Sequence, residues 1–232
     1  MKENRKMELT SYDEIFSTEE SRQDAAREKV MEIPLSELYA FKNHPFKVQD
    51  DEQMLDTAQS IREYGVLVPA IARPRKDGGY ELISGHRRKR GCELAGLETM
   101  PVIVRDMDDD AAICVMVDSN IQRESLLPSE RAFAYQMKLE AMKRQGTRRD
   151  LTSGQVGPKL RSNAIVAEQA GESVKQVQRF IRLTKLIPQL LDMVDEKRIA
   201  FNPAVELSYL KPQEQTELLD AMESEQATPS LS

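Results

Sequence analysis

The chain has 232 residues, with 33 Lys and Arg against 39 Asp and Glu, which gives a net charge of -6 and an isoelectric point near 5.2. This balance excludes a uniformly basic nucleic-acid coat, so any contact with DNA must come from local patches. The length suits two modest domains with cores of their own. No apolar run approaches the ~18 residues that a membrane span needs. We therefore expect a cytoplasmic protein with no membrane partner.

The two cysteines, Cys92 and Cys114, lie far apart in the sequence. They form no CxxC motif, and no histidine lies at a metal-ligand spacing from either. We expect two buried thiols that a reducing compartment keeps free.

The first half of the chain reads as a small α/β domain. Residues 1–29 mix charges of both signs without an apolar stripe, and we expect a flexible segment there. Turn signals and apolar runs then predict a helix from Asp51 to a Gly65 cap and a hairpin turn at residues 76–79. The predicted strands are 30–34, 67–73, 80–83 and 101–105. The hairpin predicts a mixed sheet in a domain spanning 30–125.

Residues 83–91 are the most distinctive stretch, because a strand passes through Gly85 into a strongly basic helix. Glycine allows close approach of the backbone to a ligand, and the first turn of a helix presents unpaired N–H groups at the positive end of the macrodipole. With Arg87, Arg88 and Arg90 in that helix, phosphate is the expected anion. The alternative is a solvated basic helix face.

A second polar cluster follows the predicted helix that starts at Asp108–Asp110. Residues 118–124 are rich in hydrogen-bond donors and acceptors, and Asn120 offers an amide oxygen. They favour a ligand-binding turn. The alternative is a helix C-terminal cap whose side chains bond only to the backbone.

The rest of the chain reads as helical, in a domain spanning 126–222 with a polar, disordered tail at 223–232. Glycines and a proline predict a flexible basic connector at 145–160. Beyond it, a helix at 162–170, a turn at Gly171 and a helix capped by Ser173, with Gln176 completing a capping box, predict a helix-turn-helix at 162–186. An ordinary helical hairpin remains the alternative.

Taken together, the motifs resemble the ParB family of plasmid and chromosome partition proteins. The similar segments are the glycine-to-proline strand of 65–74, the G-x-R-R motif of 84–90, the N-x-Q-R motif of 120–123 and the helix-turn-helix. The resemblance implies an α+β protein, with a small mixed-sheet ParB/sulfiredoxin-like domain followed by an all-α helix-turn-helix domain.

The resemblance also implies a function. A ParB-like protein would bind CTP with Mg²⁺, load at a centromere-like site on double-stranded DNA and close as a homodimeric clamp, on the nucleoid, with a partition ATPase as a further partner. Asn120 would contribute its amide oxygen as a ligand to the metal. The implied nucleotide-binding residues are Ser84, Gly85, His86, Arg87, Arg88, Asn120, Gln122 and Arg123.

For DNA, the polar face of the second helix is the expected base reader, since Gln can pair with adenine and Arg with guanine in the major groove. Basic residues near the connector suit phosphates. The residues of the reading face are Ser173, Lys175, Gln176, Gln178 and Arg179. The phosphate-binding residues are Arg148, Arg149, Lys159 and Arg161.

Three positions depart from the family pattern. Ser119 replaces a common acid, so CTP hydrolysis is left open and we name no catalytic residue. His86 stands where glutamate is frequent, and we assign it no chemistry. Val174 stands where arginine is common, so the DNA site can differ.

Two other functions remain open at this stage. One is a helix-turn-helix transcription regulator without nucleotide switching, and the other is a nuclease or phosphotransferase on the ParB fold. Sulfiredoxin chemistry needs a cysteine in the glycine loop, which is absent here. The family often adds a C-terminal dimerisation domain; after Met222 that domain is either absent or has been removed, and dimerisation would then rest on the first domain.

Overall fold

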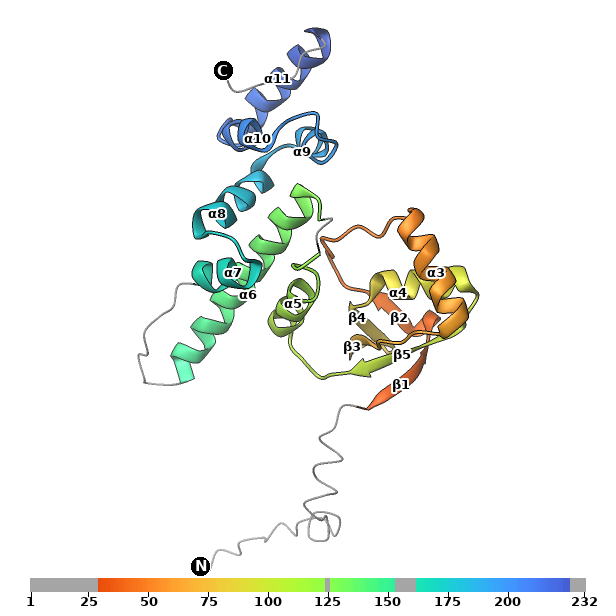
Figure 1. The fold of residues 1–232 in the computed structure, drawn as a ribbon. Helices are drawn as coiled ribbons and strands as arrows, with labels where there is room; N and C mark the ends of the chain where they lie inside the picture. The colour runs from red at the N-terminus through yellow and green to blue at the C-terminus, as the bar shows by residue number, and fades with distance from the viewer. Residues whose placement is uncertain (1–28, 124–125, 153–161, 226–232) are drawn as a thin grey trace, which may run out of the picture.

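The computed structural model describes residues 29–123, 126–152 and 162–225. An α/β region comes first and a helical region follows it (Figure 1). Among the described residues, no helix has both the length and the apolar character to cross a membrane.

The α/β region is built on a five-stranded mixed sheet in the order β1-β5-β3-β4-β2. The β1–β5 and β3–β4 pairs are antiparallel, while β3–β5 and β2–β4 are parallel. The mixed sheet that the hairpin predicted is thus confirmed. The strands are β1 (Val30–Pro34), β2 (Leu38–Ala40), β3 (Ala70–Pro74), β4 (Tyr80–Ser84) and β5 (Thr99–Val104), with a short 3-10 helix, η1, at Leu35–Glu37.

Helices cover both faces of this sheet. Successive residues of a strand point to opposite faces, and in β4 Leu82 packs into a cluster with Ile61 and Cys92, whereas Ile83 packs into the cluster that holds Met116. Helices α3 (Glu52–Tyr64) and α4 (His86–Ala95) therefore lie on one side, and α5 (Asp109–Asp118) lies between the sheet and α6 (Figure 1).

The ends of these helices follow the capping signals in the sequence. Asp51 and Asp108 accept hydrogen bonds at the N-termini of α3 and α5, from Met54 N and Ala111 N, each at 2.8 Å. Gly65 ends α3 with positive φ, as predicted, and Gly96 ends α4 in the same way. One strand prediction was wrong at its start, because β3 begins at Ala70 rather than at residue 67.

The helical region begins with α6 (Pro128–Thr152), which is longer than predicted. The expected connector from residue 145 is wrong up to Thr152, since the helix continues through Gly146. A single glycine inside a helix costs only ~1 kcal/mol, and Arg144 anchors this part of α6 to the buried Asp110 of α5, with Nε 2.7 Å from Oδ1.

The helix-turn-helix geometry follows α6. Helix α7 (Ser162–Ala170), a turn at Gly171 with φ +65°, and α8 (Val174–Arg182) pack against α6. Ser173 Oγ accepts from Gln176 N at 3.1 Å, which is one half of the predicted capping box; the Gln176 side chain instead accepts from Arg179. The remaining elements are η2 (Leu183–Lys185), α9 (Pro188–Asp195), α10 (Phe201–Leu207) and α11 (Pro212–Glu225).

Candidate functional site

A cavity of about 290 Å³ forms where β4 ends and α4 begins. It joins two predicted motifs that lie more than thirty residues apart in sequence. The lining residues are His44, Phe46, Lys47, Val48, Ser84, Gly85, His86, Arg87, Arg88, Ser119, Asn120 and Arg123.

Gly85 fixes the entry into α4. Its φ is +109°, and a Cβ there would lie 2.8 Å from the Cβ of Ala70. Side chains rarely adopt that backbone conformation, and β3 leaves no room for one, so the position requires glycine. The turn delivers the N-terminus of α4 to the cavity, where a helix favours an anion.

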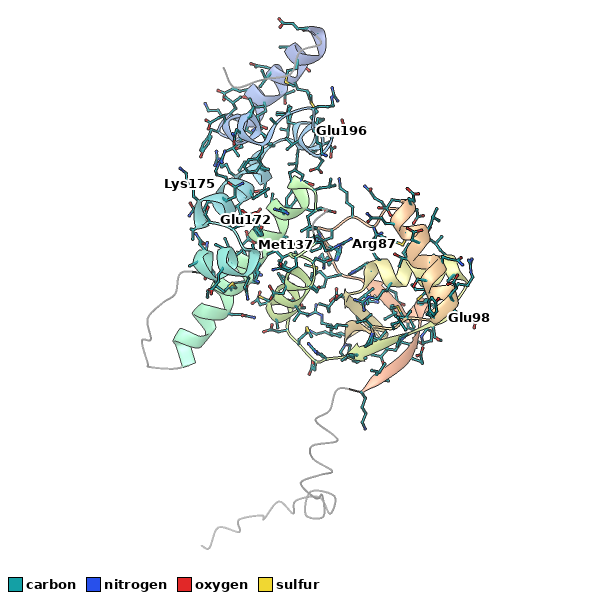
Figure 2. The ribbon with its side chains drawn as sticks, viewed as in Figure 1. Arg87, Glu98, Met137, Glu172, Lys175 and Glu196 are labelled. Carbon is teal, nitrogen blue, oxygen red and sulfur yellow. The ribbon has the colours of Figure 1, made fainter. Side chains whose placement is uncertain are left out.

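The three arginines of α4 have different surroundings. Arg87 lines the cavity, and its Nη2 lies 3.2 Å from Asp51 Oδ1. It lies on the side of α4 that faces the helical region (Figure 2). Arg88 also lines the cavity, while its Nη1 donates to the carbonyls of Val68 at 2.8 Å and Pro69 at 2.6 Å. Burial lowers the pKa of Arg88 from its usual value.

Arg90 was grouped with these arginines in the sequence, and the structure separates it from them. Its guanidinium pairs with both oxygens of Asp50 at 2.5 and 2.9 Å and with Glu93 at 3.1 Å. The hydrogen bonds that Arg90 donates to Asp50, and then to Glu93, raise its pKa. Arg90 is absent from the cavity lining; it shares a face of α4 with Arg87 but lies almost one turn further from the N-terminus of the helix.

The turn after α5 supplies the opposite wall. Asn120 Nδ2 donates to Met116 O at 2.8 Å, so the cap that we left as an alternative does form. Its Oδ1, 3.4 Å from Arg123 Nη1, belongs to the same cavity wall. Cap and ligand roles are therefore compatible in one residue. Gln122 is not in the lining; its Nε2 donates to Gln169 O at 2.7 Å.

Two histidines line the same cavity, and His44 was missed from the sequence. The rings of His44 and His86 stack at 3.8 Å between centroids. Both Nε2 atoms are buried without a hydrogen-bond partner among the described residues. Burial, then the neighbouring His44 and Lys89, lower the pKa of His86 to about 3. His44 precedes a turn proline, and nothing in the sequence around it indicates that its ring would stack on His86.

Lys47 was also missed. It lines the cavity together with Arg87 and Arg123, and these three cations also line a neighbouring cavity of about 360 Å³. The backbone N–H of Lys47 donates to Glu130 Oε1 at 2.7 Å, which fixes the loop to the start of α6. The arrangement can hold a polyanion whose charges lie along this shared wall.

A metal ion would depend on its ligand here. No cluster of three or more His, Cys, Asp or Glu within the described ranges could hold a metal by itself. Mg²⁺ is commonly bound through one or two protein oxygens plus substrate phosphates and water, and Asn120 Oδ1 on the cavity wall fits that role.

The predicted DNA-reading residues lie on α8, apart from its Ser173 cap. Lys175 and Gln178 are exposed, and Lys175 projects from α8 on the side away from the sheet (Figure 2). Arg179 bonds to Asn202, and its guanidinium carbon lies 5.0 Å from the centre of the Phe201 ring. The side chains of Arg148 and Arg149, together with Lys159 and Arg161, lie outside the described residues.

Fold and site thus define a mixed-sheet domain with a cationic cavity, followed by a helix-turn-helix region. The family comparison agrees, since residues 19–121 match the ParB N-terminal domain. Residues 19–121 thus belong to the ParB N-terminal domain family, and the resemblance seen in the motifs is confirmed.

Two curated relatives illustrate the match. The chain is 33% identical over 185 residues to the chromosome-partitioning protein Spo0J of Thermus thermophilus, covering 80% of this chain and 62% of that protein. It is 38% identical over 114 residues to a nucleoid occlusion protein of Halalkalibacterium halodurans, covering 49% of this chain and 40% of that protein. The chain thus spans about two fifths to three fifths of their lengths.

One solved structure with a TM-score above 0.5 supports the fold. The match to the C-terminally truncated ParB of Caulobacter crescentus complexed to the centromeric parS site covers 85% of this chain and 94% of the Caulobacter chain. Its TM-score is 0.51 and the sequence identity is 22%. The match to the same protein complexed with CTP-γ-S covers 78% of this chain and 93% of the Caulobacter chain, with a TM-score of 0.39 and 27% identity.

Proposed function

We propose that this chain is a ParB-like partition protein that binds a centromere-like DNA site through α7 and α8, and CTP in the cationic cavity. Nucleotide binding closes two protomers into a clamp on DNA during chromosome or plasmid segregation. The carrying observation is that one cavity joins Gly85, Arg87 and Arg88 to Asn120 and Arg123. The choice of CTP follows the family resemblance of these motifs.

Each group has a physical task in this proposal. The α4 N-terminus and Arg87 hold phosphates. Arg123, across the cavity, reaches the same phosphates. Asn120 contributes an oxygen to Mg²⁺, which when bound neutralises phosphate charge.

Hydrolysis is not required by this proposal. Ser119 lines the cavity, and its hydroxyl donates to Met116 O at 2.9 Å. A serine there supplies no carboxylate to a metal or a water, so binding and release can switch the clamp without rapid turnover.

The test is calorimetric titration of the full chain with CTP and Mg²⁺, then with ATP, GTP and UTP, with and without a parS duplex. We expect CTP to bind preferentially and Arg87→Ala to weaken it ~10-fold or more, because a charge-assisted phosphate contact is lost. Arg90→Ala is the matched control on the same helix, and we expect little change. Light scattering of the same samples reports the dimer.

Two results would contradict the proposal. If no nucleotide binds with or without DNA, the chain is a DNA-binding regulator without the switch. If Arg87→Ala and Arg90→Ala weaken CTP equally, the cavity is not the site.

A further inference from the structure

The turn after α5 has two sides. Ser119, Asn120 and Arg123 line the cationic cavity. Gln122, within the same turn, donates to the backbone oxygen of Gln169 on α7 at 2.7 Å. A five-residue segment, 119–123, therefore touches both the cavity and the first helix of the helix-turn-helix.

Lys138 of α6 strengthens this connection. Its side chain is only 2% exposed, and its ammonium donates to Asp118, the last residue of α5, and to the side-chain oxygen of Gln169. Burying an ammonium costs free energy that a well-packed apolar residue would not. A buried lysine bridging three helices therefore suggests a role in fixing their arrangement.

We propose that Lys138 and Gln169 are positioning residues that couple occupation of the cavity to the placement of α7, and through it α8, against α6. A phosphate that draws Arg123 or Asn120 inward moves the turn that begins at Asp118. Gln122 passes this movement directly to the backbone of Gln169. Asp118 passes it to the side chain of Gln169 through the Lys138 ammonium. The inference rests on the proposed function, because it needs both a cavity ligand and DNA on α8.

The experiment measures a coupling factor, defined as the ratio of the CTP dissociation constants of the full chain without and with a parS duplex, with Mg²⁺ present. Coupling is reciprocal, and typical factors are about 5 to 150. We expect the unmodified chain to fall in this range. We expect Lys138→Met and Gln169→Leu each to lower the factor about twofold or more, because the route through the Lys138 ammonium is lost while the Gln122 bond to the backbone oxygen of Gln169 stays.

Two further variants separate coupling from folding. Gln169→Glu keeps an oxygen acceptor for Lys138, and we expect it to retain the factor. Gln136→Ala removes an α6 side chain whose hydrogen bond within the described part of the chain runs along its own helix, to Glu140 at 3.0 Å, and we expect it to behave as the unmodified chain. Gln169 is exposed, so Gln169→Leu folds even if the buried Lys138→Met does not.

Several outcomes would overturn the inference. An unchanged factor in Gln169→Leu rejects it, as does loss of the factor in Gln136→Ala. A factor of one in an unmodified chain that binds both ligands rejects the coupling and leaves the proposed function standing. Failure of the unmodified chain to bind CTP rejects the proposed function first, and this inference with it.

Discussion

At the scale of single residues, Asp51 has two tasks in the structure. Its carboxylate caps α3 by accepting from Met54 N at 2.8 Å, and it pairs with Arg87 at 3.2 Å. The Arg87 hydrogen bond, then the Met54 N–H, lower the pKa of Asp51. A phosphate entering the cavity must compete with this carboxylate for Arg87.

Replacing Asp51 with Asn should therefore tighten CTP binding. Asn caps helices as well as Asp, so the fold keeps its α3 terminus while Arg87 loses its competing charge. We expect a gain of about two- to fivefold, the scale of an exposed ion pair, measured by calorimetry. Asp50→Asn is the control, because Asp50 pairs with Arg90 outside the cavity. Equal gains in both variants would contradict the competition.

His86 should make the fold sensitive to acid. Burial, with His44 and Lys89 nearby, lowers its pKa from 6.5 to about 3. Below pH 6.5 His86 binds a proton in the unfolded chain but not in the folded chain. The free energy of unfolding therefore falls as the pH drops from 6.5 toward 3. One proton gives a limiting slope of about 1.4 kcal/mol per pH unit.

The measurement is urea unfolding of the unmodified chain and of His86→Gln between pH 7.5 and 5. We expect the variant to lose less stability over this interval. The carboxylates that titrate below pH 5 are common to both chains. Parallel curves would show that His86 takes up protons equally well when folded.

The arginines show what sequence can and cannot give at this scale. The glycine and the basic helix predicted an anion site, and Arg87 and Arg88 do line a cavity. The sequence could not show that Arg90 would turn to Asp50, because that pairing depends on a loop forty residues earlier in the chain. His44 was missed for the same reason, since its stack with His86 is a tertiary contact.

At the scale of elements, strong local signals predicted most of the helices and strands. Caps placed α3, α4, α5 and α8 correctly. Strand β2 was missed because it has three residues and gains its pairing only beside β4. The end of α6 was misplaced because packing against α5 outweighs the breaking tendency of Gly146.

Helix α8 is the element on which DNA specificity should depend. Arg179 is held by Asn202 and Phe201 of α10, so it must exchange Asn202 for a base edge. We expect Arg179→Ala to reduce discrimination between parS and scrambled DNA by ~1–3 kcal/mol. Arg149→Ala, at a position predicted to bind phosphate, should weaken both DNAs alike and reduce the salt dependence. Footprinting at two salt concentrations measures both effects, and equal losses on both DNAs for Arg179→Ala would refute the assignment.

At the scale of the whole molecule, the two regions share one apolar core. Phe41, Phe46 and Ile83 of the α/β region pack in the same cluster as Tyr135 of α6 and Leu190 of α9. Polar contacts join the same two regions, including Lys47 N to Glu130 Oε1 at 2.7 Å and the Lys47 ammonium to Asp195 Oδ2 at 3.7 Å. The boundary at residue 125 stays a prediction, and cooperative unfolding measures how independent the segments on either side of it are.

A shared core predicts that the ligand-free chain unfolds in one transition. Exposing either half would expose apolar surface of the other, so partly unfolded states lose the contacts of both. Scanning calorimetry should give a calorimetric enthalpy equal to the van't Hoff enthalpy, about 0.7 kcal/mol per residue at 60 °C. Phe46→Ala, at a site only 4% exposed, should cost ~3–5 kcal/mol and shift the whole transition. Two separated transitions, of which Phe46→Ala moved only one, would show that the halves fold independently.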